Sequence, residues 1–107
     1  MRSADVFLFD RRAGRLVEFD EGGYEFRYDT DYLAHPGALP LSFTLPLRVE
    51  PFQSRFLFSF FDGLIPEGWL LDVAQASWKL DPRDRMGLLL ACCRDCIGAA
   101  SIREVPS

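Results

Sequence analysis

The sequence has few histidine, cysteine and methionine residues, and it has no long apolar run. Its 107 residues include one histidine, three cysteines and two methionines. No stretch approaches the roughly 20 apolar residues of a membrane-spanning helix. The first ten residues also lack the apolar core of a secretory signal. These absences argue against a disulfide-stabilised secreted domain and a membrane span, so the sequence predicts a cytoplasmic protein.

Basic residues are outnumbered by acidic ones, and this limits the partners. The chain has 12 lysines and arginines against 16 aspartates and glutamates, a formal net charge of -4. An acidic chain repels a phosphate backbone, so we expect no direct binding of nucleic acid. Disorder is disfavoured as well, because 49% of the residues are hydrophobic and ten are Phe. This is enough apolar surface for one core, and we expect a single domain over residues 1–107.

The three cysteines lie close together near the end of the sequence, at Cys92, Cys93 and Cys96. A structural zinc site needs four ligands, and the other candidate soft ligand, His35, lies far away in a proline-rich segment. A zinc site and a redox pair remain alternatives. We favour reduced thiols, with Cys92 packed as a small apolar residue. We therefore expect no metal and no cofactor.

The first third of the sequence predicts an antiparallel meander of three strands. Asp5–Phe9, with the short apolar run Val6–Phe9, is the first expected strand. Arg15–Asp20 is the second, after a turn that ends at Gly14, where glycine is free to take a positive φ. The paired glycines of residues 21–23 predict the next turn. Tyr24–Tyr28 alternates aromatic and charged residues, the period-two pattern of a half-buried strand.

The middle of the sequence is irregular. Residues 29–51 contain four prolines, which remove backbone donors, so we expect no long regular element there. Within it, Leu41–Leu45 is a candidate edge strand. The aromatic segment Phe52–Phe61 is expected to form a short helix or turn that fills the core.

The second half predicts two helices and a last strand. Pro66 suits the first turn of a helix, and Glu67 would then lie near its positive end. Asp81 predicts the N-cap of a second helix, with Asp84 as its capping-box partner. Ala99–Val105 would return to the sheet. The fold class that follows is α+β, a small antiparallel sheet of a meander plus a C-terminal strand, packed with two α-helices.

Candidate catalytic residues are few. Asp62 and Glu67 could act as paired carboxylates, but a turn acid and a helix-start acid, each favoured by local backbone donors, are the better explanation. His35 fits a loop histidine, and the glycines of residues 22–23 are not followed by the Lys-Ser/Thr of a phosphate-binding loop. We therefore expect no catalytic residues and no enzyme activity.

One residue has the character of an interface anchor. Trp69 follows Gly68 in the expected first turn of a helix, at the border between the apolar and polar faces. A half-exposed Trp at a helix terminus is a typical contact residue in protein interfaces. A lid over the core is the alternative, and the sequence leaves both open.

Three segments resemble a known family. Phe60–Gly68, FFDGLIPEG, resembles a signature of the N-terminal region of HipA-type toxin kinases. Pro40–Leu47, PLSFTLPL, is similar to the PLSLSLPL segment of that region, and Arg94–Ala100, RDCIGAA, is similar to its end. Their order and spacing agree, and the likeness covers nearly the whole chain.

The resemblance implies a function. In full-length HipA kinases this region precedes the kinase core. In three-gene systems of the HipBST type, a separate short protein of this kind neutralises the HipA-like serine/threonine kinase, alongside a HipB-like helix-turn-helix protein. Those kinases phosphorylate aminoacyl-tRNA synthetases. The resemblance therefore implies a bacterial antitoxin, similar to HipS.

Two alternatives stay open. The chain begins at Met1 and stops at Ser107, where a kinase core would begin, so we expect a separate polypeptide. The first alternative is the regulatory N-terminal subdomain of a full-length HipA-type kinase. The second is a small enzyme that uses Asp62 and Glu67. For the antitoxin, we expect the loop and helix start to contact the kinase, with Trp69 as the main anchor; the contact residues would be Asp62, Gly63, Ile65, Glu67, Gly68 and Trp69.

Overall fold

A computed structural model of the chain describes residues 1–65, 83–92 and 100–105. Five strands and three helices lie in these ranges. In chain order they are β1 (Arg2–Leu8), β2 (Arg11–Glu18), β3 (Tyr24–Tyr28), α1 (Thr30–Ala34), β4 (Phe52–Ser54), α2 (Ser59–Asp62), α4 (Arg85–Cys92) and β5 (Ala100–Val105).

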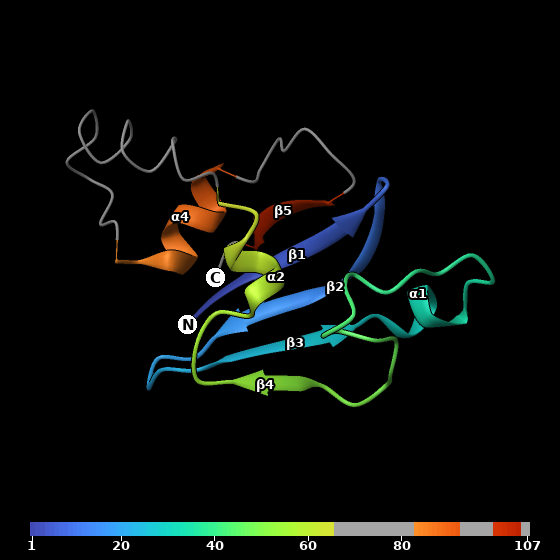
Figure 1. Cartoon of the computed structure of the whole chain (residues 1–107), viewed down its shortest axis with the longest axis horizontal. Coiled ribbons are helices and arrows are strands. Elements are labelled where there is room, and N and C mark those ends of the chain that lie inside the picture. Colours follow the sequence, from blue (N-terminus) through green and yellow to red (C-terminus); the bar gives the residue numbers. More distant parts are fainter. Residues whose placement is uncertain (66–82, 93–99, 106–107) are drawn as a thin grey trace.

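The strands form one antiparallel sheet in the order β4-β3-β2-β1-β5 (Figure 1). The meander β1-β2-β3 and the returning strand β5 confirm the predicted topology, because β5 pairs with β1 from Ser3↔Val105 to Leu8↔Ala100. The sheet gains one strand that the sequence did not predict, since β4 pairs with β3 at Phe26↔Phe52. The α+β fold class is therefore as expected, with a five-stranded open sheet.

The first hairpin turns at a different place from the one predicted. Leu8 pairs with Arg11, so the turn consists of Phe9 and Asp10 alone, with φ angles of 51° and 65°. Gly14 is not in a turn but within β2, where a Cβ would collide with the backbone carbonyl of Arg27 on β3. The glycine therefore permits close approach of two strands rather than a positive φ.

The second turn is as predicted. Gly22 and Gly23 have φ angles of 96° and 97°, which residues with a side chain rarely adopt. The Gly22 amide donates to the Phe19 carbonyl at 3.0 Å and closes the turn.

The proline-rich segment is irregular apart from the five-residue helix α1, and the predicted edge strand Leu41–Leu45 is not part of the sheet. A tight turn replaces it, since the Leu45 amide donates to the Ser42 carbonyl at 3.1 Å. Leu41 and Leu45 are buried, and the Tyr28 hydroxyl bonds both residues, accepting from the Leu41 amide at 2.9 Å and donating to the Leu45 carbonyl. These contacts hold the segment against the core, so the edge of the sheet is left to β4.

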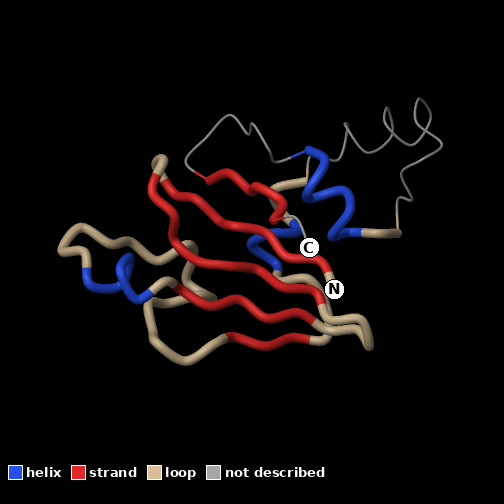
Figure 2. Tube along the Cα trace, turned by 180° about the vertical axis from the view of Figure 1, so that it is seen from behind, coloured by secondary structure: helices blue, strands red, loops and turns tan. Residues whose placement is uncertain are grey.

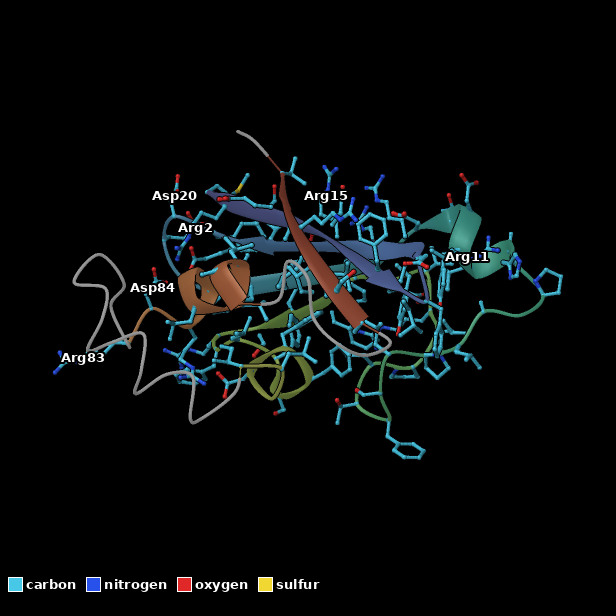
Figure 3. The ribbon with its side chains drawn as sticks, turned by 90° about the horizontal axis from the view of Figure 1, so that it is seen from above. Arg2, Arg11, Arg15, Asp20, Arg83 and Asp84 are labelled. Carbon is cyan, nitrogen blue, oxygen red and sulfur yellow. The ribbon has the colours of Figure 1, made fainter. Side chains whose placement is uncertain are left out.

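The core lies between the sheet and the helices α2 and α4, which cover the same face (Figure 3). Seen from behind, the five strands present their other face (Figure 2). That face carries polar residues such as Arg15, which donates to Asp5 at 3.3 Å across β1 and β2. One covered face and one polar face are usual for an antiparallel sheet. Among the described residues, no helix is long and apolar enough to cross a membrane.

Helix α4 begins three residues later than the position expected from Asp81 as the N-cap. Asp84 is the cap itself, because its carboxylate accepts from the Gly87 amide at 3.1 Å and its carbonyl accepts from the Leu88 amide at 3.0 Å. Asp81 and the first predicted helix, which starts at Pro66, lie outside the described residues.

Candidate functional site

A groove lies between the segment that joins β4 to α2 and the start of α4. Its volume is about 600 Å³. Its lining combines aromatic, hydroxyl and arginine side chains with one carboxylate and comprises Tyr24, Arg55, Phe56, Leu57, Ser59, Asp62, Gly63, Arg83 and Arg85. We refer to it as the Asp62 groove. It contains both of the described surface positions, Asp62 and Gly63, that the sequence predicted as partner contacts.

A local turn places an aromatic residue at the groove rim. Ser54 ends β4, and its hydroxyl accepts from the Phe56 amide at 3.2 Å, which bends the chain away from the sheet. The Phe56 side chain is 77% exposed as a result. An exposed large aromatic side chain is a candidate contact residue, because it offers a large apolar area that a partner can bury.

Helix α2 is held in place by Phe61, which is fully buried. Its ring lies 5.5 Å from that of Phe26 on β3 and 5.2 Å from that of Phe60, measured between centroids. The prediction that this aromatic segment fills the core is therefore confirmed for Phe61 and wrong for Phe56. Gly63 ends the helix in a right-handed conformation with φ of -69°, so its position does not require a glycine for backbone freedom.

Asp62 and Arg85 join α2 to α4 across the groove. The Arg85 Nε donates to the Asp62 Oδ1 at 2.6 Å. The Arg85 side chain is 33% exposed and the Asp62 side chain is 44% exposed. Solvent therefore screens the ion pair, and its contribution to stability is small. The pair nonetheless fixes where the carboxylate lies, and this Asp62 oxygen is already engaged within the chain.

A second ion cluster fixes the start of α4 against the sheet. Arg2 on β1 donates from both terminal nitrogens to Asp84, at 2.9 and 2.7 Å, and from Nε to Glu18 at 2.7 Å. Tyr24 adds a hydrogen bond from its hydroxyl to Glu18 at 3.3 Å. We refer to these four residues as the Arg2 cluster. Figure 3 shows Arg2 and Asp84 side by side at the end of the sheet, with Arg83 pointing outward beside them.

The shifted pKa values belong to this cluster and to the core. Hydrogen bonds from Arg2 hold the pKa of Asp84 below its usual range, and the same bond raises the pKa of Arg2. Burial raises the pKa values of Tyr24 and Tyr28. Ion pairing and core packing explain each shift, so none of them points to catalysis.

The six predicted contact residues have different outcomes. Asp62 and Gly63 line the groove, whereas Ile65 is only 4% exposed and belongs to the core. Ile65 therefore supports the segment from inside and is not available as a surface contact. The remaining three residues, Glu67, Gly68 and Trp69, lie outside the described residues.

Sequence reasoning missed the groove residues that come from elsewhere in the chain. Arg85 reaches Asp62 across a sequence separation of 23 residues, which no local pattern reveals. Arg55 and Phe56 lie in a run rich in Phe, and hydrophobicity alone made that run look like core. The one available signal was Ser54, which favours a turn two residues before the exposed Phe.

The cysteine and histidine candidates gain no metal site in the described part of the chain. No group of three or more His, Cys, Asp or Glu that could hold a metal occurs there. Cys92 ends α4, and Cys93 and Cys96 lie outside the described residues. His35 ends α1, and its Nδ1 accepts from the Gly37 amide at 3.1 Å, in agreement with a loop histidine.

The sequence and the fold both match one family. The family model for the HipA N-terminal domain matches residues 4–103. A protein of Haemophilus influenzae is 36% identical over 104 residues, covering 97% of this chain and 93% of that protein. A protein of Sinorhizobium fredii named "Putative kinase Y4mE" is 31% identical over 102 residues, which are 95% of this chain but only 24% of that protein.

A solved structure agrees in fold. The chain described as "N-terminal domain of HipA toxin" matches with a TM-score of 0.77 and 33% sequence identity, covering 100% of this chain and 95% of that one. The motifs quoted from the sequence therefore lie within a match of fold and sequence over nearly the whole chain, and the chain belongs to the HipA N-terminal domain family.

Proposed function

We propose that the chain is an antitoxin that binds and neutralises a HipA-like serine/threonine kinase in the bacterial cytoplasm, in a complex with a HipB-like DNA-binding protein. Membership of the family links the chain to a HipA-type kinase. The observation that carries the proposal is the Asp62 groove, in which an exposed aromatic, Phe56, adjoins the predicted contact positions Asp62 and Gly63.

The proposed contact runs along the segment that begins at the groove. Asp62 and Gly63 start it, and Glu67, Gly68 and Trp69 continue it in the sequence. Trp69 acts as the anchor, because burying an indole in an interface commonly contributes about 2 kcal/mol or more. Glu67 adds charge complementarity, which affects the association rate more than the affinity. The chain itself is proposed to catalyse nothing.

The test is binding of purified chain to a HipA-type kinase encoded in the same genome, followed by kinase activity. Trp69→Ala is expected to weaken binding more than tenfold and to relieve inhibition, provided that circular dichroism shows an unchanged fold. A folded variant that binds and inhibits as well as the parent would remove Trp69 from the interface. Glu67→Lys replaces it as a probe if Trp69→Ala fails to fold.

A second candidate function has its own observation. The chain matches 24% of the length of the Sinorhizobium kinase-named protein, so this region also occurs as part of longer chains. In that case the domain regulates a kinase core in the same polypeptide. Gene neighbourhood separates the two functions, because an antitoxin requires a nearby separate gene that encodes kinase motifs without this N-terminal region.

A further inference from the structure

The charged side chains around the Asp62 groove are mostly basic. A second groove of about 460 Å³ adjoins it and shares a wall made of Phe56, Leu57 and Ser59. Among the described residues, five charged ones line the two grooves, and Asp62 is the one acid in that set; the others are Arg48, Arg55, Arg83 and Arg85. The whole chain has 16 acidic residues against 12 basic ones, so this surface has the opposite balance.

These arginines differ in their partners, and two of them have no ion pair with a carboxylate among the described residues. Asp62 is engaged by Arg85. Arg48 stacks on the Phe52 ring, with its Cζ 3.7 Å from the centroid, and donates to the carbonyls of residues 50 and 51 at 3.1 Å. Arg55 has no ion-pair partner in the part of the chain that the structure describes. Arg48 and Arg55 therefore have no ion-pair partner among the described residues. One carboxylate lies on the other side of the pair Arg55 and Phe56, because Glu21 lines a neighbouring groove of about 310 Å³ with them.

An exposed aromatic lies between these charges. Phe56 lines both grooves, follows Arg55 directly, and is 77% exposed. The contrast with the Arg2 cluster is informative, since there each charge has a partner at 2.7 to 2.9 Å. Uncompensated arginines around an exposed Phe fit a partner that supplies both carboxylates and an apolar contact.

We propose that this Arg55–Phe56 ridge, with Arg48 on one side and Arg85 on the other, docks an acidic segment of the partner protein, one in which aspartates or glutamates flank an apolar contact for Phe56. The inference rests on the proposed function, because the segment would belong to the HipA-type kinase. A nucleic acid is the less favourable occupant, since the net charge of -4 repels a continuous phosphate backbone. A nucleic acid would also give Phe56 an apolar partner only where its bases stack on the ring.

The experiment measures kinase binding by calorimetry at low and high salt for the parent chain and for matched variants. Arg55→Glu is expected to weaken binding about tenfold and to reduce its salt dependence, because charge reversal removes an attraction that salt screens. Arg55→Lys, which keeps the charge, should lose less. Arg11→Glu is the control, since Arg11 is exposed at the far end of the sheet (Figure 3) and should bind within about twofold of the parent.

The outcomes separate this inference from the proposed function. If the parent chain binds the kinase and Arg55→Glu and Arg48→Glu both bind equally well with unchanged salt dependence, the ridge is not the docking surface, although the antitoxin function stands. If the parent does not bind the kinase, the proposed function fails. The ridge is then tested with a synthetic peptide of glutamate and leucine residues.

The peptide arm has its own decisive results. Binding by the parent that is lost in Arg55→Glu supports an acidic-segment surface. No binding, or equal binding by Arg55→Glu, overturns the inference. A single-stranded DNA oligonucleotide is measured in parallel, and tighter binding to it than to the peptide would contradict the choice of a protein partner. Circular dichroism confirms the fold of every variant.

Discussion

Arginines have different surroundings in two regions of this molecule. In the Arg2 cluster, one guanidinium from β1 binds Asp84 at the start of α4 and Glu18 on β2, so each of its three nitrogens donates to a carboxylate of the chain. At the Arg55–Phe56 ridge, arginines exceed carboxylates and surround an exposed aromatic. The first region joins an element to the sheet, and the second offers charges that a partner could satisfy.

The role of an arginine in this molecule therefore depends on whether a carboxylate of the same chain pairs with it. A paired arginine such as Arg2 supports the fold, whereas an unpaired one such as Arg55 is available to a binding partner. Exposed ion pairs contribute only about 0 to 1 kcal/mol each, so the ridge residues have little influence on stability. Variants in the core and in the Arg2 cluster should therefore change stability, whereas ridge variants should change binding.

The largest loss of stability should come from a substitution in the core. Phe61→Ala removes a fully buried ring that packs on Phe26 and Phe60 and leaves a cavity. We expect the free energy of unfolding to fall by about 3–5 kcal/mol. Urea denaturation followed by circular dichroism measures it. A loss below about 1 kcal/mol would mean that α2 is not anchored as described.

Phe56→Ala is the matched variant five residues earlier. Because Phe56 is 77% exposed, we expect its unfolding free energy to stay within about 0.5 kcal/mol of the parent. Affinity for the kinase should fall more than tenfold if the ridge is a contact surface. A large loss of stability would place this ring in the core and erase the distinction between the two Phe residues.

Asp84→Ala tests the Arg2 cluster, since it removes both the cap of α4 and the partner of Arg2. We expect a loss of about 1–2 kcal/mol at neutral pH. Because hydrogen bonds from Arg2 lower the pKa of Asp84, its contribution is present above the unfolded pKa of about 4 and is lost as pH falls through the lower folded pKa.

The gap in melting temperature between the parent and Asp84→Ala should therefore close as pH falls below about 4. Thermal melts across an acid series measure it. A gap that stays constant with pH would show that capping geometry, rather than the ionised carboxylate, carries the effect.

The smallest expected change is a gain in stability from substitutions in the first turn. Phe9 and Asp10 form the first turn at positive φ, where side chains are strained, and Phe9 is 68% exposed. Phe9→Asn and Asp10→Gly should each raise the free energy of unfolding by about 0.5–1 kcal/mol, because Asn and Gly suit this two-residue turn. A drop in melting temperature for both would mean that the turn has another conformation.

Local patterns were enough to predict most of the sheet. The alternation in Tyr24–Tyr28 and the paired glycines of residues 22–23 each specify structure through neighbours alone. The first turn was misplaced because Phe9 is not a usual turn former at positive φ, while Gly14 is one by type. In the fold, Gly14 is needed because a Cβ at this position would collide with the backbone carbonyl of Arg27 on β3. This steric constraint arises only when the two strands pair.

The site was harder to predict, because it is assembled from distant segments. Asp62 and Gly63 were found through a motif, but the arginines that define their electrostatics come from β4's end and from α4. Arg2 and Asp84 are 82 residues apart, and only the fold brings them together. The cap of α4 shows the same limit of local patterns. Asp81 and Asp84 both precede the helix as candidate caps, and the one that caps it, Asp84, is also the one that pairs with Arg2 on β1.

The measurement that tests the account most directly is phosphorylation by a HipA-type kinase of the same genome, followed as increasing amounts of this chain are added. The account expects activity to fall to background with the parent chain, and to require at least about tenfold more of the Phe56→Ala variant, whose melting temperature is unchanged. Undiminished kinase activity in the presence of excess folded parent chain would contradict it.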